Sequence, residues 1–388
     1  MSKTDVIVVG AGPAGAWAAY CLARRGARVT VFDHSHPREK PCGGGLTRRA
    51  LNLVTPAIGS LDGVDVARGL FDDPRTRPAA VDLEALDRRS SLLIVSRRLF
   101  DARLLQAACD AGAEHRRERV VDVIATPHGA KVTTDRSSHA ASWLIGADGA
   151  NSLVRRRLQQ PFRRDQLSIA SGVYAHGRTA QEIVIRFVTD PPGYIWSFPR
   201  TDHLAIGICA QADVAGASQL RRVLHDWLAA SGLGANARLE RYAWPIPSLS
   251  AHDFATARPA GQRHLLIGDA AGLVDPITRE GIFFALQSAA LAADALCVTK
   301  PADNTYCAAL RDDMLPELRS AARLKQGFFR GPFTRLMVDA IRHSRGVQRV
   351  AADLIMGAQS YRALKLRLLR TWEWRLAWQL VRLGREPS

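Results

Sequence analysis

The residues of this chain with the clearest chemical meaning are three glycines near its start. Gly10, Gly12 and Gly15 have G-x-G-x-x-G spacing directly after the apolar run 5–9, and an alanine-rich stretch follows them. The first glycine permits a tight turn, the second lets a pyrophosphate approach the backbone, and the third lets helix and strand pack closely. The pyrophosphate then binds the free N–H groups at the helix N-terminus. This spacing between a strand and a helix predicts a dinucleotide site.

An acidic residue completes this pattern. The second apolar run, 28–32, ends in Asp33, at about the ~20-residue spacing at which a carboxylate binds the ribose 2′-hydroxyl. We therefore expect Asp33 to bind the ribose, and Pro13 and Ala14 at the start of the helix to lie against the cofactor. Without the acid and the second strand, the glycines could equally form a turn in another α/β fold.

Two further groups of residues could take part in chemistry. Cys42 lies between Pro41 and three glycines, which let the backbone lie flat against a planar ring. Its thiol is a candidate proton donor or redox switch, and a small apolar residue packed beside a cofactor is the alternative. Tyr194, Trp196 and Phe198 alternate along a strand, so their side chains share one face. They form either a cavity wall or a buried aromatic stripe, and Tyr194 and bulk water are the other candidate proton donors.

The hydrophobic pattern predicts the elements that position these residues. A strand–helix–strand unit opens the chain over 1–33, a basic glycine-rich loop follows over 34–55, and 56–95 reads as an irregular segment that bears strands. Helices are predicted over 96–112, near 217–231 and from about 281 onward. Further strands are predicted at 120–124, 130–133, 143–145, 183–187, 194–198, 204–208 and 264–267. His176 and His203 are expected at the surface.

Composition restricts the class of protein. The chain has 388 residues, of which 47% are hydrophobic and 23% charged, as in ordinary globular proteins. No apolar run reaches the length of about 18 residues that a transmembrane helix needs. The first strand begins too early for a signal peptide, so we expect a cytoplasmic protein. Six scattered cysteines without a C-x-x-C pair predict neither a disulfide framework nor a metal site.

The formal charge of +16 is concentrated near the C-terminus. Residues 321–388 contain 14 lysines or arginines and 4 acidic residues, and Trp372, Trp374 and Trp378 lie among the basic side chains. Tryptophan with arginine on one helix is typical of an interfacial helix on anionic lipid, which predicts peripheral binding to an anionic membrane surface. A helical cap over the substrate domain is the alternative. Without a recognised nucleic-acid motif, no nucleic-acid partner is expected.

Three separated motifs together resemble the flavoprotein group typified by the aromatic hydroxylases. They are the G-x-G-x-x-G run, Asp148-Gly149 and Gly268-Asp269. The resemblance implies FAD as the cofactor. It also implies that Asp148 and Gly149 touch the pyrophosphate region and that the Gly268-Asp269 motif places its carboxylate on the ribityl chain.

Three more runs narrow this resemblance to the geranylgeranyl reductase family of FAD-dependent oxidoreductases. They are K-P-C-G-G-G-L at 40–46, P-G-Y-I-W-S-F-P at 192–199 and P-I-T-R-E-G-I at 276–282. Position 279 is Arg where many relatives carry Gly, which bears on the conformation of that loop. The resemblance implies further cofactor contacts at Cys42, Gly43, Arg97, Val121, Gly281 and Ile282.

Members of this family saturate carbon–carbon double bonds in long prenyl chains, such as those of chlorophyll precursors, archaeal ether lipids, menaquinones and geranylgeranyl diphosphate. The resemblance therefore implies a reductase of isoprenoid double bonds that uses hydride from N5 of reduced flavin. It makes Tyr194, Trp196 and Phe198 the wall of the substrate cavity. An isolated alkene is a poor hydride acceptor and needs a dry, shaped site. No second G-x-G-x-x-G run is present, so no separate nicotinamide domain is expected. The candidate electron donors are NADPH that binds transiently, ferredoxin and a reduced quinone pool.

Two other functions remain open at this point. A flavin-dependent monooxygenase or halogenase shares the fold and the first three motifs, although no lysine lies between Ser168 and Ala251 to serve a halogenase. A lipid-binding flavoprotein with structural FAD is the second alternative.

The predicted fold class is α/β. A Rossmann-like FAD-binding domain is expected over 1–164 and 255–310, with 56–95 contributing in part to the substrate side. An inserted antiparallel-sheet substrate domain is expected over 165–254, and a helical C-terminal region over 311–388.

Overall fold

The computed structural model describes residues 5–83, 92–298, 301–358, 360–371 and 378. A six-stranded sheet at one end has the order β18-β19-β12-β1-β2-β8, and all of its strand pairs are parallel except β18–β19. Its strands are β1 (Asp5–Val9), β2 (Arg28–Phe32), β8 (Glu114–Arg116), β12 (Trp143–Gly146), β18 (Ala260–Gly261) and β19 (His264–Leu266). A parallel sheet of this kind needs cover on both faces, because its central strands β1 and β12 are almost entirely buried.

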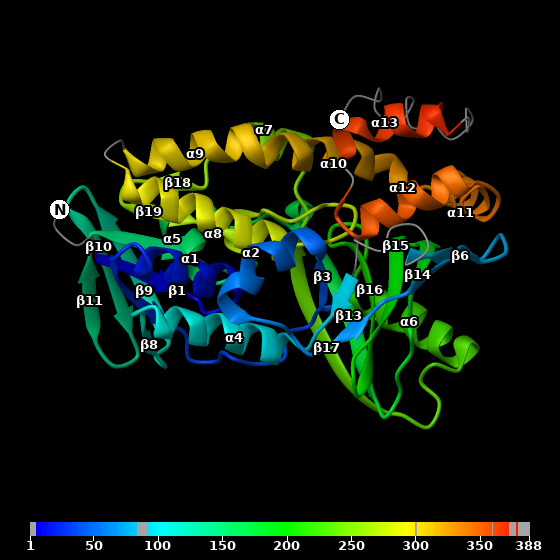
Figure 1. The fold of residues 1–388 in the computed structure, drawn as a ribbon, viewed down its shortest axis with the longest axis horizontal. Coiled ribbons are helices and arrows are strands. Elements are labelled where there is room, and N and C mark those ends of the chain that lie inside the picture. The colour runs from blue at the N-terminus through cyan, green and yellow to red at the C-terminus, as the bar shows by residue number, and fades with distance from the viewer. Residues whose placement is uncertain (1–4, 84–91, 299–300, 359, 372–377, 379–388) are drawn as a thin grey trace.

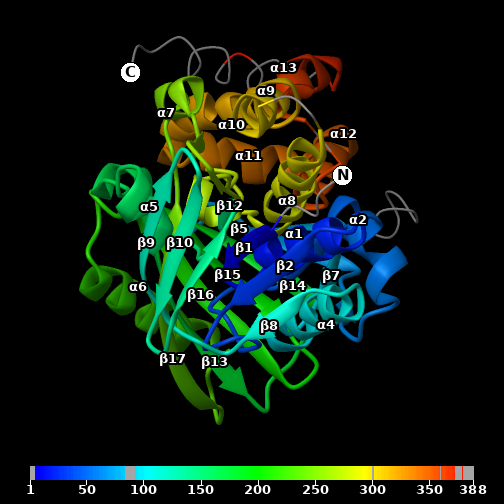
Figure 2. The same ribbon diagram turned by 90° about the vertical axis from the view of Figure 1, so that its left-hand side faces the viewer.

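Helices and a small sheet supply that cover. Helix α1 packs against α4 and α8, while the sheet β11-β10-β9 contacts β1 and β12 (Figure 2). The helices are α1 (Pro13–Ala23), α4 (Arg97–Asp110) and α8 (Ile282–Cys297), and the strands are β9 (Val120–Thr126), β10 (Gly129–Thr134) and β11 (Ser138–Ala141). Short α5 (Leu153–Leu158) follows β12. These elements share one apolar core.

A seven-stranded sheet with the order β17-β13-β16-β15-β14-β5-β6 forms the other end. Neighbours in it are antiparallel except β14 and β5. Its strands are β5 (Arg68–Asp72), β6 (Ala79–Asp82), β13 (Leu167–His176), β14 (Glu182–Thr189), β15 (Pro192–Pro199), β16 (His203–Gln211) and β17 (Arg238–Pro247). The segment 56–95 thus supplies two strands to this sheet. It also supplies β4 (Val64–Asp65) and β7 (Leu92–Ile94), and β7 pairs with both β4 and β3 (Gly45–Thr47) in a small separate sheet.

Each face of this sheet has its own cover. Helix α6 (Ala217–Ser231) packs on one face, with the 3-10 turn Arg164–Gln166 leading into β13 and α7 (Ala251–Thr256) following β17. The C-terminal helices pack on the other face, where Figure 1 shows them in orange and red beside the green strands. They are α10 (Leu315–Phe328), α11 (Gly331–His343), α12 (Arg345–Ile355) and α13 (Tyr361–Arg370), preceded by α9 (Ala302–Asp313). The expected α/β fold with antiparallel strands and C-terminal helices is confirmed.

The prediction of a loop over the whole of 34–55 is wrong. Strand β3 begins at Gly45, and α2 (Arg48–Ile58) follows it directly. The helix has a reason in the sequence, because Ala50, Val54 and Ile58 recur every four residues and are all buried. Pro56 and the glycines upstream concealed this amphipathic pattern.

Candidate active site

The dinucleotide loop has the tight geometry that its glycines predict. Gly10 has φ +102°, and a Cβ there would lie 2.5 Å from the carbonyl oxygen of Ala147. A Cβ on Gly15 would lie 1.8 Å from the carbonyl oxygen of Gly10. At Gly12 the nearest heavy atom to such a Cβ is 3.6 Å away, on His36. The loop is therefore closed on the side of the sheet and open at the glycine that would approach a pyrophosphate.

Asp33, at the end of β2, binds this loop. Its Oδ2 accepts a hydrogen bond from the N–H of Ala11 at 2.9 Å and lies 2.8 Å from Nδ1 of His36. Its Oδ1 accepts from the N–H and hydroxyl of Ser35, at 2.7 and 2.9 Å. Burial alone would raise the pKa of Asp33, but the hydrogen bonds from His36, Ala11 and Ser35 hold it well below its usual value. A ribose hydroxyl would have to replace the Ser35 hydroxyl, so ribose binding stays a prediction.

A chain of buried charges connects Asp33 to Cys42. Nε2 of His36 lies 3.3 Å from Oδ2 of Asp101, and Arg97 donates two hydrogen bonds to the Asp101 carboxylate, at 3.0 and 2.9 Å. Burial alone would lower the pKa of Arg97, but Asp101 and the thiol of Cys42 beside it raise that pKa above its usual value. The sequence indicated Arg97 and Cys42, whereas the linking role of His36 and Asp101 depends on the fold.

The Asp148 carboxylate caps a helix. It accepts hydrogen bonds from the N–H groups of Leu153 and Val154, at 2.6 and 3.2 Å, at the start of α5. The segment still lies beside the dinucleotide loop, since Ala147 is the residue that a Cβ on Gly10 would meet. Its backbone, with Gly149 at φ +80°, is therefore the part available to a cofactor.

The Gly268-Asp269 turn lies between the dinucleotide helix and the loop 275–281. A Cβ on Gly268 would be 3.0 Å from the Cβ of Ala14, and one on Gly281 would be 3.2 Å from Oδ1 of Asp269. Oδ2 of Asp269 lies 3.1 Å from Nζ of Lys40, which is four-fifths buried. Lys40 is thus a site residue. The sequence placed it in the motif 40–46 but indicated no role for its side chain.

Arg279 departs from the usual glycine at the bend of this loop. Its φ of +61° lies in the left-handed region that favours glycine, so the resemblance correctly indicated an unusual position. The guanidinium donates a hydrogen bond to the hydroxyl of Ser248. On the other side of the loop, the hydroxyl of Thr47 donates to Oε1 of Glu280 at 2.8 Å. These side chains hold an arginine in a conformation that costs strain.

An apolar cavity of about 280 Å³ joins these residues to the seven-stranded sheet. Seven of the sixteen expected cofactor contacts line it, namely Pro13, Cys42, Gly43, Arg97, Asp269, Gly281 and Ile282. Tyr194, Trp196 and Phe198 line it from β15. Asp33, Asp148 and Gly149 lie outside this lining, and so does Val121, which is 44% exposed on β9.

The Tyr194 hydroxyl is engaged with the backbone. It donates a hydrogen bond to the carbonyl oxygen of Thr278 at 2.9 Å, which connects β15 to the loop 275–281. Burial raises the pKa of this phenol well above its usual value. Both features make Tyr194 a weaker acid than a free phenol.

The C-terminal helices complete the cavity, which the sequence did not reveal. Their lining residues are apolar and come from α10, α11, α12 and the segment between α10 and α11: Phe328, Phe329, Met337, Ile341, Ala351, Leu354 and Ile355. A helical cap, one of the two alternatives for this region, is therefore present. Trp372 and Trp374 lie outside the described residues, and Trp378 is 60% exposed.

These features fit FAD. The loop leaves no room for side chains at Gly10 and Gly15 and is open at Gly12, and both the three-glycine run 43–45 and Asp269 line the cavity. A backbone that approaches a ligand this closely requires glycine.

Comparison with known proteins agrees with this geometry. Residues 3–299 match the model of the FAD binding domain family. The menaquinone reductase of Mycolicibacterium smegmatis is 32% identical over 324 residues, which cover 76% of each chain. The geranylgeranyl diphosphate reductase of Rhodobacter capsulatus is 30% identical over 320 residues, 78% of each chain. This chain belongs to the geranylgeranyl reductase family of FAD-dependent oxidoreductases.

Solved structures show how widely this family's fold is shared. A geranylgeranyl bacteriochlorophyll reductase-like protein from Thermoplasma acidophilum has a TM-score of 0.77 at 21% identity, covering 95% of this chain and 99% of its own. The flavin-dependent brominase Bmp2 has a TM-score of 0.71 at 18% identity, covering 96% and 99%. At these identities the likeness concerns the fold alone, and it places reductases and halogenases on one scaffold.

Two further findings concern this reductase-family chain. None of the described helices is long and apolar enough to cross a membrane. The absence of lysine from 168–251 does not leave the cavity without one, because Lys40 lines it from a different segment. Lys40 differs from a free catalytic lysine in that Asp269 pairs with it.

Proposed function

We propose that this protein is an FAD-dependent reductase that saturates carbon–carbon double bonds of an isoprenoid chain, of the geranylgeranyl or prenyl-quinone type. The observation that carries the proposal is the apolar cavity of about 280 Å³ that extends from the three-glycine run to the C-terminal helices. Ligand pockets are lined mostly by apolar side chains with a few polar groups. An apolar cavity suits a hydrocarbon chain better than a polar substrate.

Bound and reduced FAD supplies hydride to the alkene, and the protein must position the alkene and provide a proton. Tyr194, Trp196 and Phe198 form an aromatic wall that holds a flat, apolar chain and excludes water. Exclusion of water matters, because hydride transfer to an isolated alkene depends on close, fixed positioning. The loop around Gly43 has no side chain there, and a Cβ would meet the Phe198 ring at 2.6 Å.

Cys42 is the better proton donor of the two candidates. Its Sγ faces the cavity and accepts a hydrogen bond from the N–H of Gly44 at 3.3 Å. The Arg97 guanidinium lies beside this sulfur. The Tyr194 hydroxyl, by contrast, already donates a hydrogen bond to the carbonyl oxygen of Thr278.

Other parts of the proposal concern the surroundings of the site. NADPH or ferredoxin is proposed as the electron donor. The prenyl substrate would be delivered from an anionic membrane surface that the basic C-terminal helices bind, so a cytoplasmic and peripheral location is proposed. The relatives named for menaquinone and geranylgeranyl diphosphate support the substrate class.

Mass spectrometry of a substrate panel tests the proposal. Menaquinone, geranylgeranyl diphosphate and a geranylgeranyl lipid are incubated with the purified protein, anaerobically with dithionite-reduced FAD and aerobically with NADPH. We expect a gain of about two mass units per double bond without oxygen, since hydride plus proton is the stoichiometry. A gain of one oxygen atom, in air only, would instead identify a monooxygenase. Bound lipid that is unchanged in both arms would identify a lipid-binding flavoprotein.

A further inference from the structure

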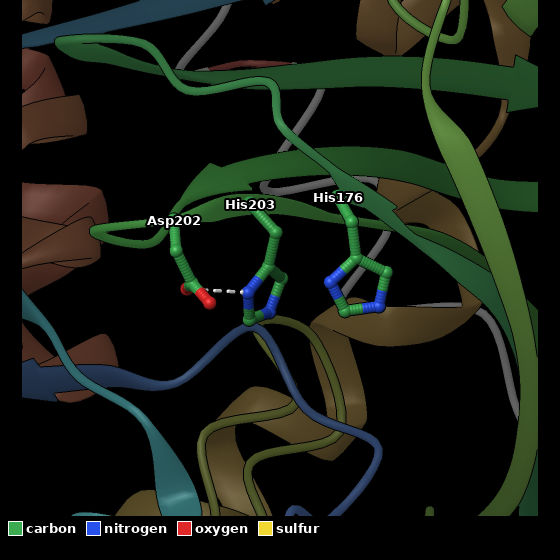
Figure 3. A group of neighbouring side chains, drawn as sticks. All are labelled: His176, Asp202 and His203. Carbon is green, nitrogen blue, oxygen red and sulfur yellow. Dashed lines mark hydrogen bonds and ion pairs between the residues drawn. The ribbon is translucent and has the colours of Figure 1, made fainter.

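A cluster of metal-binding side chains lies at the end of the seven-stranded sheet. His176 ends β13, Asp202 precedes β16, and His203 begins it. His176 and His203 are directly opposite each other in the antiparallel register of the two strands. Figure 3 shows the two imidazole rings side by side, with Asp202 on the far side of His203. Ligand atoms of all three residues lie within 4.8 Å of one another.

Nothing in the spacing of these residues predicts the cluster, and the surface position predicted for His203 is wrong. The residue is only 6% exposed, because it packs edge-on against Tyr174 with the ring centroids 5.1 Å apart. His176 is half-buried and Asp202 is exposed, so solvent reaches the cluster from one side.

A carboxylate lies beside each histidine. Nδ1 of His203 lies 2.7 Å from Oδ1 of Asp202, and Nε2 of His176 lies 3.0 Å from Oε2 of Glu240 on β17. Metal-binding histidines characteristically donate the N–H of their other ring nitrogen to a carboxylate, which fixes the tautomer and the direction of the lone pair. Glu240 therefore constrains the His176 ring as a metal site would require, and Asp202 places a carboxylate beside the His203 ring.

The remaining nitrogen of His203 lacks a partner. Its Nε2 is buried and has no hydrogen-bond partner among the described residues, and a buried polar atom without a partner is costly. This nitrogen is therefore available to an ion bound at the cluster.

We propose that His176, Asp202 and His203 bind a divalent transition-metal ion of the zinc type, with Glu240 orienting His176. Two imidazoles and a carboxylate form a common zinc ligand set, with the fourth position open to water or another ligand. Ligands at zinc distances of 2.0–2.1 Å lie about 3.3 Å apart in tetrahedral geometry. The exposed Asp202 side chain can move to close the observed spacing.

The position of the cluster suggests what the ion would stabilise. The N–H of Arg200 donates to the carbonyl oxygen of His203 at 2.7 Å, and its guanidinium donates to the carbonyl oxygen of Cys42 at 3.0 Å. A metal ion that fixes the 200–203 turn would therefore also fix the loop that carries Cys42. The site itself is separate from the cavity lining and does not depend on the proposed reaction.

Zinc binding to the tag-free, FAD-loaded protein tests this proposal. The protein is treated with EDTA, dialysed against buffered Zn²⁺ or Mg²⁺, and analysed for bound metal, with affinity measured against a chromophoric zinc indicator. We expect one tightly bound Zn²⁺ per chain and no stoichiometric Mg²⁺, since Mg²⁺ prefers oxygen ligands.

Variants show whether the bound ion occupies this cluster. His176→Ala should lose at least ~100-fold in zinc affinity, and Glu240→Gln about 10–100-fold, the usual effect of removing an orienting partner. His225→Ala is the matched control, because His225 also pairs with a neighbouring aspartate, Asp226, but lies 83% exposed with no second histidine in a described cluster. It should bind zinc as the parent does. Retention of FAD absorbance and circular dichroism shows that each variant is folded. Unchanged zinc affinity in folded His176→Ala, or no stoichiometric zinc in the parent, would overturn the proposal.

Discussion

Replacing His36 by glutamine should loosen the dinucleotide loop from helix α4. His36 lies between Asp33 and Asp101, with 2.8 Å to the first carboxylate and 3.3 Å to the second, and its side chain is 10% exposed. Glutamine retains a polar group of similar length but removes the positive charge. The two carboxylates would then lie close together without the cation between them.

The size of the effect follows from the remaining partners. Removing one member of a buried ion pair costs about 3–5 kcal/mol when the other charge is left alone. Here Asp101 keeps both hydrogen bonds from Arg97, and Asp33 keeps the N–H of Ala11. We therefore expect a smaller loss of unfolding free energy, about 2 kcal/mol, similar to one charged hydrogen bond. If the loop must be ordered to bind FAD, its affinity should fall by about 30-fold.

The pH dependence provides a second measure. Burial alone would lower the pKa of His36, but the bonds to Asp101 and Asp33 raise it above its usual 6.5. A group whose pKa is raised by folding stabilises the protein fully below its unfolded pKa and loses that contribution as pH rises through the folded value. The parent should therefore lose stability above about pH 6.5, and His36→Gln should lack this alkaline component.

Thermal unfolding and FAD fluorescence titrations from pH 6 to 9 measure both quantities. His128→Gln is the control, because His128 is exposed in the turn between β9 and β10. If His36→Gln unfolds like the parent at pH 6 and keeps the same pH profile, then the chain from Asp33 to Arg97 does not hold the cofactor loop.

Four other substitutions probe the cavity. Tyr194→Phe should cost about 1 kcal/mol of stability, because the hydrogen bond to Thr278 is lost, and should leave the rate of reduction nearly unchanged. Cys42→Ala should slow the anaerobic reoxidation of reduced flavin by alkene by about 10²–10⁴-fold. If Tyr194→Phe slowed this reoxidation and Cys42→Ala did not, Tyr194 would be the proton donor. Gly43→Ala should lower turnover by at least ~10-fold while FAD absorbance is retained, because its Cβ would lie 2.6 Å from Phe198, and Gly216→Ala, with nothing within 4 Å, is the control. Ala351→Phe should shift the preference toward shorter prenyl substrates in product analysis, because it fills the cavity from α12; an unchanged preference would place the chain elsewhere.

The predictions for the cofactor side of the site rest on local constraints. Gly10 and Gly15 occupy positions where a Cβ would overlap backbone atoms. Only glycine fits there, so their spacing in the sequence predicts the turn between β1 and α1. The same holds for the alternation of Tyr194, Trp196 and Phe198, since strand geometry alone puts them on one face.

The rest of the site depends on contacts between distant segments. His36 and Asp101 are 65 positions apart, and nothing in their spacing predicts an ion pair. Lys40 is 229 positions from Asp269, and the cavity-lining residues of α11 and α12 read in the sequence as parts of basic amphipathic helices. The positive charge of the C-terminal region indicates membrane binding, whereas the apolar side chains of the same region line the cavity.

Lys40 lines the cavity as one half of an ion pair. Its ammonium lies 3.1 Å from Asp269, which neutralises it, and 6.0 Å from the centre of the Trp244 ring, whose face attracts a cation. The family resemblance assigns Asp269 to the ribityl chain, and a ribityl hydroxyl would compete with Lys40 for that carboxylate. A neutral hydroxyl binds a carboxylate more weakly than an ammonium does, and an unpaired ammonium in an apolar cavity is costly. The pair should therefore persist beside the cofactor. A paired lysine leaves the cavity apolar, as saturation of an alkene requires, whereas an oxygen-dependent reaction through Lys40 would first have to separate it from Asp269.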